Sequence, residues 1–188
     1  MRLFVAIELS DDVRRAMAAV ASGLRQKLGG SVRARWTPVE NMHLTVRFIG
    51  HVDDERVPAV VAALKPSLGT GPVEIAFGRC GVFPSHGPPR VLWIGVAAGA
   101  SSLKAIHDEL NDRLRPLGFE PETRPYSAHL TLARVQDVPR AAAAALRDAM
   151  RTTAATDARC RIDHATVFES RPSPRGSTYF PLVNIPLS

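Results

Sequence analysis

The stretch HLTV at residues 43–46 returns as HLTL at residues 129–132, and this repeat decides how the chain is interpreted. Both stretches alternate polar and apolar residues, which predicts β-strands with histidine and threonine on one face and two aliphatic residues on the other. One His-x-Thr is typical of half-buried strand residues that bond to the backbone. Its repetition in a second strand instead favours a functional pair.

The two histidines have the chemistry of an acid and a base. A neutral imidazole accepts a proton, an imidazolium donates one, and a pKa of about 6.5 permits both near neutral pH. On opposite sides of one phosphorus, His43 and His129 could activate water and protonate the leaving oxygen. The hydroxyls of Thr45 and Thr131 could bind the non-bridging oxygens. A cyclic 2′,3′-phosphodiester suits this arrangement, because its ring already holds the leaving oxygen, and no metal is required.

The composition indicates a folded protein with an anionic ligand. At 188 residues and 45% hydrophobic content, the chain suits one domain or two small fused lobes. The net charge is +6, and only Lys27, Lys65 and Lys104 are lysines, so 21 of the 24 basic residues are arginine. Arginine binds phosphate through two parallel hydrogen bonds, although genomic base composition explains the same bias equally well.

Other sequence signals favour a reduced, cytoplasmic protein without cofactors. Cys80 and Cys160 lack the spacing of a redox or zinc motif. The N-terminal apolar run is too short for a signal peptide, and no stretch has the length of a membrane span. Neither a P-loop nor a dinucleotide motif is present. Four further histidines lack metal-ligand spacing relative to one another: His51, His86, His107 and His164.

The periodicity of apolar residues predicts an α+β fold with two similar halves and mostly antiparallel sheets. Strands are expected at residues 3–9, 43–50, 73–82, 91–96, 127–135, 161–169 and 178–187. Helices are expected from a cap at Ser10 to residue 28, over 53–68, from a cap at Ser101 or Ser102 to residue 114, and over 139–150.

The chain resembles the two-histidine phosphoesterase superfamily, and within it the LigT-like RNA 2′,3′-cyclic phosphodiesterases, formerly called 2′-5′ RNA ligases. Four segments carry the resemblance: RLFVAI at 2–7, NMHLTVRFIG at 41–50, VLWIG at 91–95 and RPYSAHLTLAR at 124–134. Ala128 stands where the family often has proline.

The resemblance implies one bilobal catalytic domain over residues 1–188, in which each lobe is an antiparallel sheet backed by helices. A cleft lies between the lobes, and each lobe contributes one histidine motif. His43 would be the proton donor, His129 the proton acceptor, and Thr45 and Thr131 phosphate ligands. The product would be a 2′-phosphomonoester, with O3′ leaving. The implied partners are RNA with cyclic phosphate ends or small cyclic nucleotides, and we expect a monomer without an obligate protein partner.

Three further residues are candidates for substrate binding. Arg134 lies five residues after His129, so strand alternation places it on the opposite face unless a bulge intervenes. The resemblance instead favours a role for Arg134 in binding phosphate. Arg47 follows His43 by four, which predicts a shared face, and it could bind RNA phosphate or be a solvated strand-end charge. Tyr126 could stack on a nucleobase or pack in the core.

Other aromatic and basic residues could likewise contact RNA or have an ordinary structural role. Phe83 and Trp36 could stack on a base, although core packing explains both. Arg171 and Arg175, in a loop rich in proline and glycine, could steer the RNA backbone or be ordinary exposed charges.

Two other functions are compatible with the sequence. One is an RNA-binding module that kept the cleft without turnover, but a binder would not need two histidines with their threonines. The other is reversible 2′-5′ RNA ligation, which is the same chemistry run backward from a cyclic phosphate and a 5′-hydroxyl.

Overall fold

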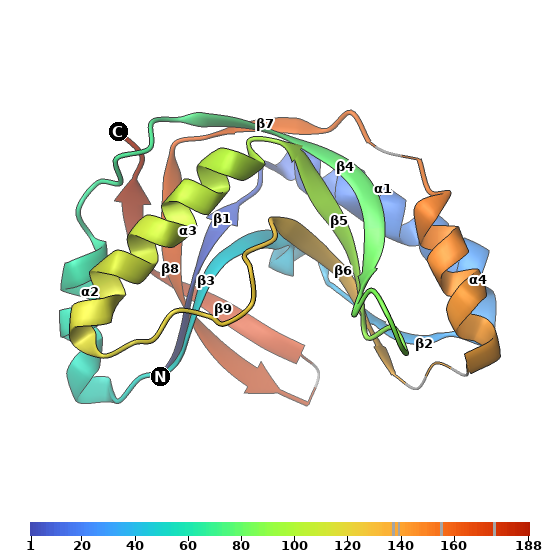
Figure 1. Ribbon diagram of the computed structural model, residues 1–188, viewed down its shortest axis with the longest axis horizontal. Coiled ribbons are helices and arrows are strands. Elements are labelled where there is room, and N and C mark those ends of the chain that lie inside the picture. Colours follow the sequence, from blue (N-terminus) through green and yellow to red (C-terminus); the bar gives the residue numbers. More distant parts are fainter. Residues whose placement is uncertain (137, 139, 155, 175) are drawn as a thin grey trace.

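The computed structural model describes residues 1–136, 138, 140–154, 156–174 and 176–188. Their strands form one antiparallel sheet in the order β7-β4-β5-β6-β3-β1-β8-β9, with β2 beside β6 (Figure 1). The strands are β1 (Arg2–Glu8), β2 (Arg33–Trp36), β3 (His43–His51), β4 (Val73–Phe83), β5 (Val91–Ala98), β6 (His129–Gln136), β7 (Arg159–Ile162), β8 (His164–Ser173) and β9 (Gly176–Pro186). The α-helices are α1 (Asp11–Leu28), α2 (Val57–Leu64), α3 (Ala100–Leu114) and α4 (Arg140–Arg151).

The sheet consists of two halves that meet where β3 lies beside β6. One half is β9-β8-β1-β3, the other is β6-β5-β4-β7, and Leu44 of β3 pairs with Leu130 of β6 at the junction. In Figure 1, α2 and α3 lie together on one side of the molecule and α1 and α4 on the other. The predicted α+β fold is confirmed, and the two expected sheets are the two halves of this curled sheet.

The alternation in the motif strands divides core from site. Leu44, Val46, Leu130 and Leu132 are at most 1% exposed and belong to the main hydrophobic core beneath the helices. The histidines and threonines between them are half-buried on the opposite face. Burial of the aliphatic side chains stabilises each strand by roughly 1.5–3 kcal/mol per residue, and this fixes which face carries the polar groups.

Three local predictions are wrong. No strand is expected at residues 33–36, yet β2 pairs with β6. The single strand expected at 161–169 is divided: β7 pairs with β4 in one half, whereas β8 pairs with β1 and β9 in the other. Helix α3 begins at Ala100, after Gly99 at φ 82°, and not after a serine cap.

Two other points concern the ends of elements. Ser10 occupies the cap position of α1, but its side chain makes no capping hydrogen bond. Pro139, the expected first residue of the fourth helix, and Arg175 lie outside the described residues.

Among the described residues, no helix is long and apolar enough to cross a membrane.

Candidate active site

The junction pair places both histidines on one face of the sheet. Because β3 and β6 are antiparallel and Leu44 is opposite Leu130, the residues flanking each leucine approach one another in exchanged order. His43 therefore lies toward Thr131, and Thr45 lies toward His129. The two motifs are related by an approximate twofold axis through the leucine pair.

Each imidazole is held by its own strand in the same way. Nδ1 of His43 donates to the carbonyl of Asn41, and Nδ1 of His129 donates to the carbonyl of Ser127, both at 2.7 Å. A carbonyl only accepts, so Nδ1 carries the proton in both rings. The nitrogen left for acid or base chemistry is Nε2 in each case.

Burial makes both imidazoles harder to protonate. Desolvation lowers the pKa of His43, the hydrogen bond to Asn41 raises it, and the charge of the nearby His129 lowers it. Desolvation likewise lowers the pKa of His129, with Ser127 raising it and the charge of Arg134 lowering it. The net direction is downward for both, so the free protein favours neutral rings until an anion arrives.

The threonines differ in their contacts. Oγ1 of Thr45 lies 3.0 Å from Nε2 of His43, so its hydroxyl donates to the neutral ring. The carbonyl of Thr131 accepts a hydrogen bond of 2.8 Å from the hydroxyl of Thr37, which anchors the segment after β2 to the second motif. Thr45 thus orients His43 directly.

Aromatic rings flank both histidines. The ring centroid of His43 lies 5.2 Å from those of Phe4 and Tyr179. His129 has Phe83 at 5.0 Å and Trp93 at 6.3 Å, both edge-on. These rings restrict the orientation of each imidazole and exclude water from its sides.

A bulge in each motif strand determines which face its arginine occupies. Between β5 and β6, Trp93 pairs with Thr131 and Leu92 pairs with Ala133, so Leu132 is the extra residue. The bulge moves Arg134 to the face of Thr131, where its charge acts on His129.

The same shift occurs in β3 and contradicts the prediction for Arg47. Ala6 pairs with Thr45 and Val5 pairs with Arg47, so Val46 is the extra residue. Arg47 therefore points away from His43, is only 4% exposed, and donates to the carbonyls of Phe48 and Glu120. The prediction that Arg47 shares the face of His43 is wrong.

Phe48 takes the place predicted for Arg47. It lies five residues after His43, as Arg134 lies five after His129, and it is 51% exposed. Its ring is 6.0 Å from that of Phe4, which itself contacts His43. The sequence interpretation missed Phe48, although the five-residue offset shared with Arg134 was a signal for it.

Tyr126 packs between α3 and the backbone of the first motif strand. Its ring stacks on His107 at 4.5 Å, and its hydroxyl donates to the carbonyl of Thr45 at 3.4 Å. His107 in turn donates to the carbonyl of Val46 at 2.7 Å. Burial raises the pKa of Tyr126. Of its two predicted roles, these contacts match core packing.

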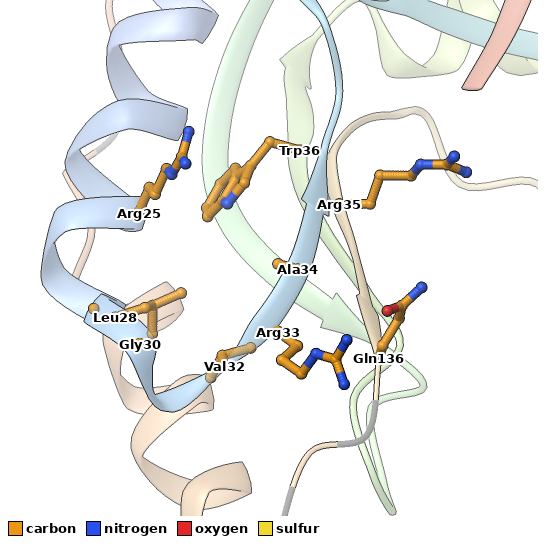
Figure 2. Close-up of a pocket in the computed structure, with 10 residues that line it drawn as sticks. Arg25, Leu28, Gly30, Val32, Arg33, Ala34, Arg35, Trp36 and Gln136 are labelled. Carbon is orange, nitrogen blue, oxygen red and sulfur yellow. The ribbon is translucent and has the colours of Figure 1, made fainter. Parts of the chain in front are cut away.

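A hollow of about 340 Å³ lies between β2 with the segment after it and the β8–β9 hairpin. Arg35, Arg134 and Tyr179 are among its lining residues. A second hollow, of about 600 Å³, is lined by residues of β2, by Gln136 of β6 and by the C-terminal end of α1 (Figure 2). The described residues contain no group of three or more histidine, cysteine, aspartate or glutamate side chains arranged to hold a metal ion.

The two related halves and their duplicated motif define the class, a phosphoesterase built by repetition. The sequence profile described as "LigT like Phosphoesterase" matches residues 7–93 and again residues 94–179, and each match contains one tetrapeptide. The chain belongs to the LigT-like phosphoesterase family.

Curated relatives agree with this membership. A protein of Archaeoglobus fulgidus is 32% identical over 136 residues, which cover 72% of this chain and 73% of the relative. A protein of Methanocaldococcus jannaschii is 34% identical, covering 72% of each chain. Both are named RNA 2′,3′-cyclic phosphodiesterase.

Solved structures share the fold. A protein of Thermus thermophilus superposes with a TM-score of 0.80 at 23% identity, covering 100% of this chain and 98% of that one. Escherichia coli LigT, solved in complex with 3′-AMP, gives a TM-score of 0.78 at 21% identity with the same coverage.

Proposed function

We propose that this phosphoesterase hydrolyses 2′,3′-cyclic phosphodiester ends of RNA to 2′-phosphomonoesters, with His43 and His129 as acid and base. The observation that carries the proposal is the matched tautomer of the two rings. Each Nδ1 is fixed on a backbone carbonyl, so each Nε2 is the nitrogen left for proton transfer, and that of His43 accepts a hydrogen bond from the Thr45 hydroxyl. Two relatives, 32% and 34% identical over 72% of this chain, carry the name of this activity.

The reaction needs one proton accepted and one donated. Nε2 of His129 takes a proton from water, the water oxygen bonds to phosphorus, and the bond from phosphorus to O3′ breaks. Nε2–H of His43 gives its proton to O3′, and the 2′-phosphate remains. We assign His43 as donor and His129 as acceptor because family membership implies this order. The pair then exchanges protons with solvent to restore the starting state.

Three further side chains stabilise the charge that develops. The hydroxyls of Thr45 and Thr131 donate to the non-bridging oxygens, which carry most negative charge in the transition state. The guanidinium of Arg134 adds a charged donor on the same face. The anionic phosphate raises the pKa of the imidazole that must be protonated, which offsets its desolvation.

The test uses purified protein with EDTA, a 2′,3′-cyclic mononucleotide and an oligoribonucleotide ending in a cyclic phosphate. We expect hydrolysis of both and a 2′-phosphate product, identified by phosphorus NMR. His43→Ala and His129→Ala are the matched controls for a contaminating nuclease. Activity that EDTA abolishes and a divalent ion restores contradicts the metal-free mechanism, and a 3′-phosphate product contradicts the assignment of O3′ as leaving group.

A further inference from the structure

A row of arginines extends from the active site along β2 and β6. The register pairs Arg35 with Arg134 and Arg33 with Gln136. Residues directly opposite in an antiparallel pair share a face, so Arg33 and Arg35 lie on the face of Arg134, which is that of Thr131. Figure 2 shows Arg33, Arg35 and Gln136 on one side of β2 and Trp36 on the other, toward α1. We name Arg134, Arg35 and Arg33 the arginine row.

The row is unfavourable without an anion. Like charges directly opposite one another destabilise an antiparallel pair, and Arg35 faces Arg134 in this way. All three arginines are exposed, and none has a carboxylate within ion-pair distance in the described part of the chain. Arg35 donates through Nη2 to the carbonyl of Pro174 at 2.8 Å, which fixes its side chain but neutralises none of its charge.

The hollow beside the row has room for a ligand. Its volume is about 340 Å³, and Arg35 and Arg134 line it together with the tip of the β8–β9 hairpin. Glu40 adds one carboxylate to the same lining, so the two arginines leave it net positive. Tyr179 lines the hollow, and its ring centroid lies 5.2 Å from that of His43, so one wall of the hollow contacts the active site.

We propose that the arginine row binds the phosphates of the RNA chain on the 5′ side of the cyclic end. Arg134 is next to the reacting phosphate, and Arg35 and Arg33 contact the phosphates that follow. Arg33 and Arg35 are two strand residues apart, about 6.6 Å, a spacing comparable with that of successive phosphates in an extended strand. A basic groove that follows the backbone is the usual means of binding single strands without reading their sequence.

The proposal rests on the proposed function for the identity of the RNA end, and it predicts a specific kinetic pattern. A mononucleotide has no phosphate beyond the cyclic one and cannot reach Arg35 or Arg33. In the double variant Arg33→Ala/Arg35→Ala, KM for a cyclic-ended oligoribonucleotide should rise several-fold, with kcat unchanged. The kcat/KM for the cyclic mononucleotide should stay within about twofold.

The decisive experiment measures binding without turnover. A fluorescent oligoribonucleotide with a 2′-phosphate end is titrated at several salt concentrations by anisotropy. Loss of two phosphate contacts should reduce the slope of log K against log salt by about 1.4, since each contact on a single strand contributes about 0.7. Arg161→Ala, an exposed arginine on the distant strand β7, removes a charge outside the row and should leave the slope unchanged. Arg35→Lys should retain most of the slope, because it keeps the charge.

The outcomes separate this proposal from the proposed function. If the slope falls as expected while neither cyclic substrate is hydrolysed, the arginine row stands and the catalytic proposal fails. If hydrolysis is normal but the double variant keeps the wild-type slope, the row does not bind RNA. A slope that falls equally in Arg161→Ala attributes the effect to net charge and overturns the assignment.

Discussion

Leu44 and Leu130 pair across β3 and β6, and they stand at the centre of the twofold relation between the motifs. Both side chains are fully buried. Because this pair fixes the antiparallel register, the apolar core determines how the histidines on the other face are placed relative to each other. A shift of one residue in either strand would turn its histidine into the core.

The catalytic histidines should carry most of the rate. His43→Ala and His129→Ala should each lower kcat by about 10²–10⁴, the contribution typical of one positioned proton transfer. The double variant should lose less than the product of the single losses, because the two residues act as a unit. Steady-state kinetics on a cyclic mononucleotide test this, with circular dichroism as the control for folding. Full activity in either single variant would refute the assignment.

The two threonine variants should differ from each other. Thr45→Ala removes a donor to phosphate and also the hydroxyl that lies 3.0 Å from Nε2 of His43, so it should cost more than Thr131→Ala. Both should cost less than loss of a histidine, because water partly replaces a hydroxyl. Thr45→Ser and Thr131→Ser keep the donor and should recover most of the activity. Equal losses of activity in the two alanine variants would show that the contact of Thr45 with His43 does not contribute to the rate.

The leaving group distinguishes the roles of the two histidines. His43→Ala should slow a substrate with an alkoxide leaving group far more than one with an activated phenolate, because a good leaving group needs no proton. His129→Ala should slow both alike, since water still needs a base. The measurement is the ratio of kcat/KM values for the two substrates in each variant. The opposite selectivity would exchange the roles of the residues.

The pH profile follows from the lowered pKa values. The reactive pair holds one proton, so kcat/KM should be bell-shaped, with limbs that belong to the coupled pair. Desolvation lowers the pKa of both rings from about 6.5, so the singly protonated form is most populated on the acid side of that value, where kcat/KM should peak. The bound anion favours the protonated ring, so the optimum for kcat should lie at higher pH. Arg134→Ala removes a cation beside His129 and should move that titration upward by NMR, whereas Arg161→Ala should not.

Arg47 should matter for stability more than for substrate binding. Arg47→Ala removes buried donors from two backbone carbonyls and should lower the free energy of unfolding by about 1–3 kcal/mol, seen as a lower Tm. The KM of the Arg47→Ala variant for RNA should change little, whereas that of Arg35→Ala should rise. A normal Tm with a raised KM would restore the interpretation of Arg47 as a phosphate ligand.

Gly81 provides a test of the packing around His129. A Cβ at Gly81 would overlap the ring of Trp93, which lies opposite it on β5 and packs beside His129. Gly81→Ala should therefore displace the indole, destabilise the fold by about 1–3 kcal/mol and lower kcat. Gly71→Ala is the matched control, since no atom lies within 4 Å of a Cβ there. Unchanged Tm and kcat in Gly81→Ala would show that Trp93 does not restrict the imidazole.

The sequence predicted the motif strands because their alternation is imposed by the core. It misplaced Arg47 because a bulge inserts one residue and reverses every later side chain, and neither Val46 nor Leu132 signals such an insertion. For Arg134, strand alternation permits a site role only with a bulge, and the structure contains that bulge. Strand β2 was missed because its pairing depends on the free edge of β6, which residues 33–36 do not encode.

Phe48 and Arg134 occupy equivalent positions, each five residues after its histidine, but they differ in chemistry. Two tetrapeptides related by a twofold axis offer the same groups to either ring oxygen, so alone they cannot distinguish O2′ from O3′. An exposed aromatic ring in one half and a cation in the other remove this equivalence. If the ring opens to the 2′-phosphate, as we propose, the preference must come from outside the repeated motifs, and Phe48 and Arg134 are the first residues after the motifs that differ in chemical character on the reactive face.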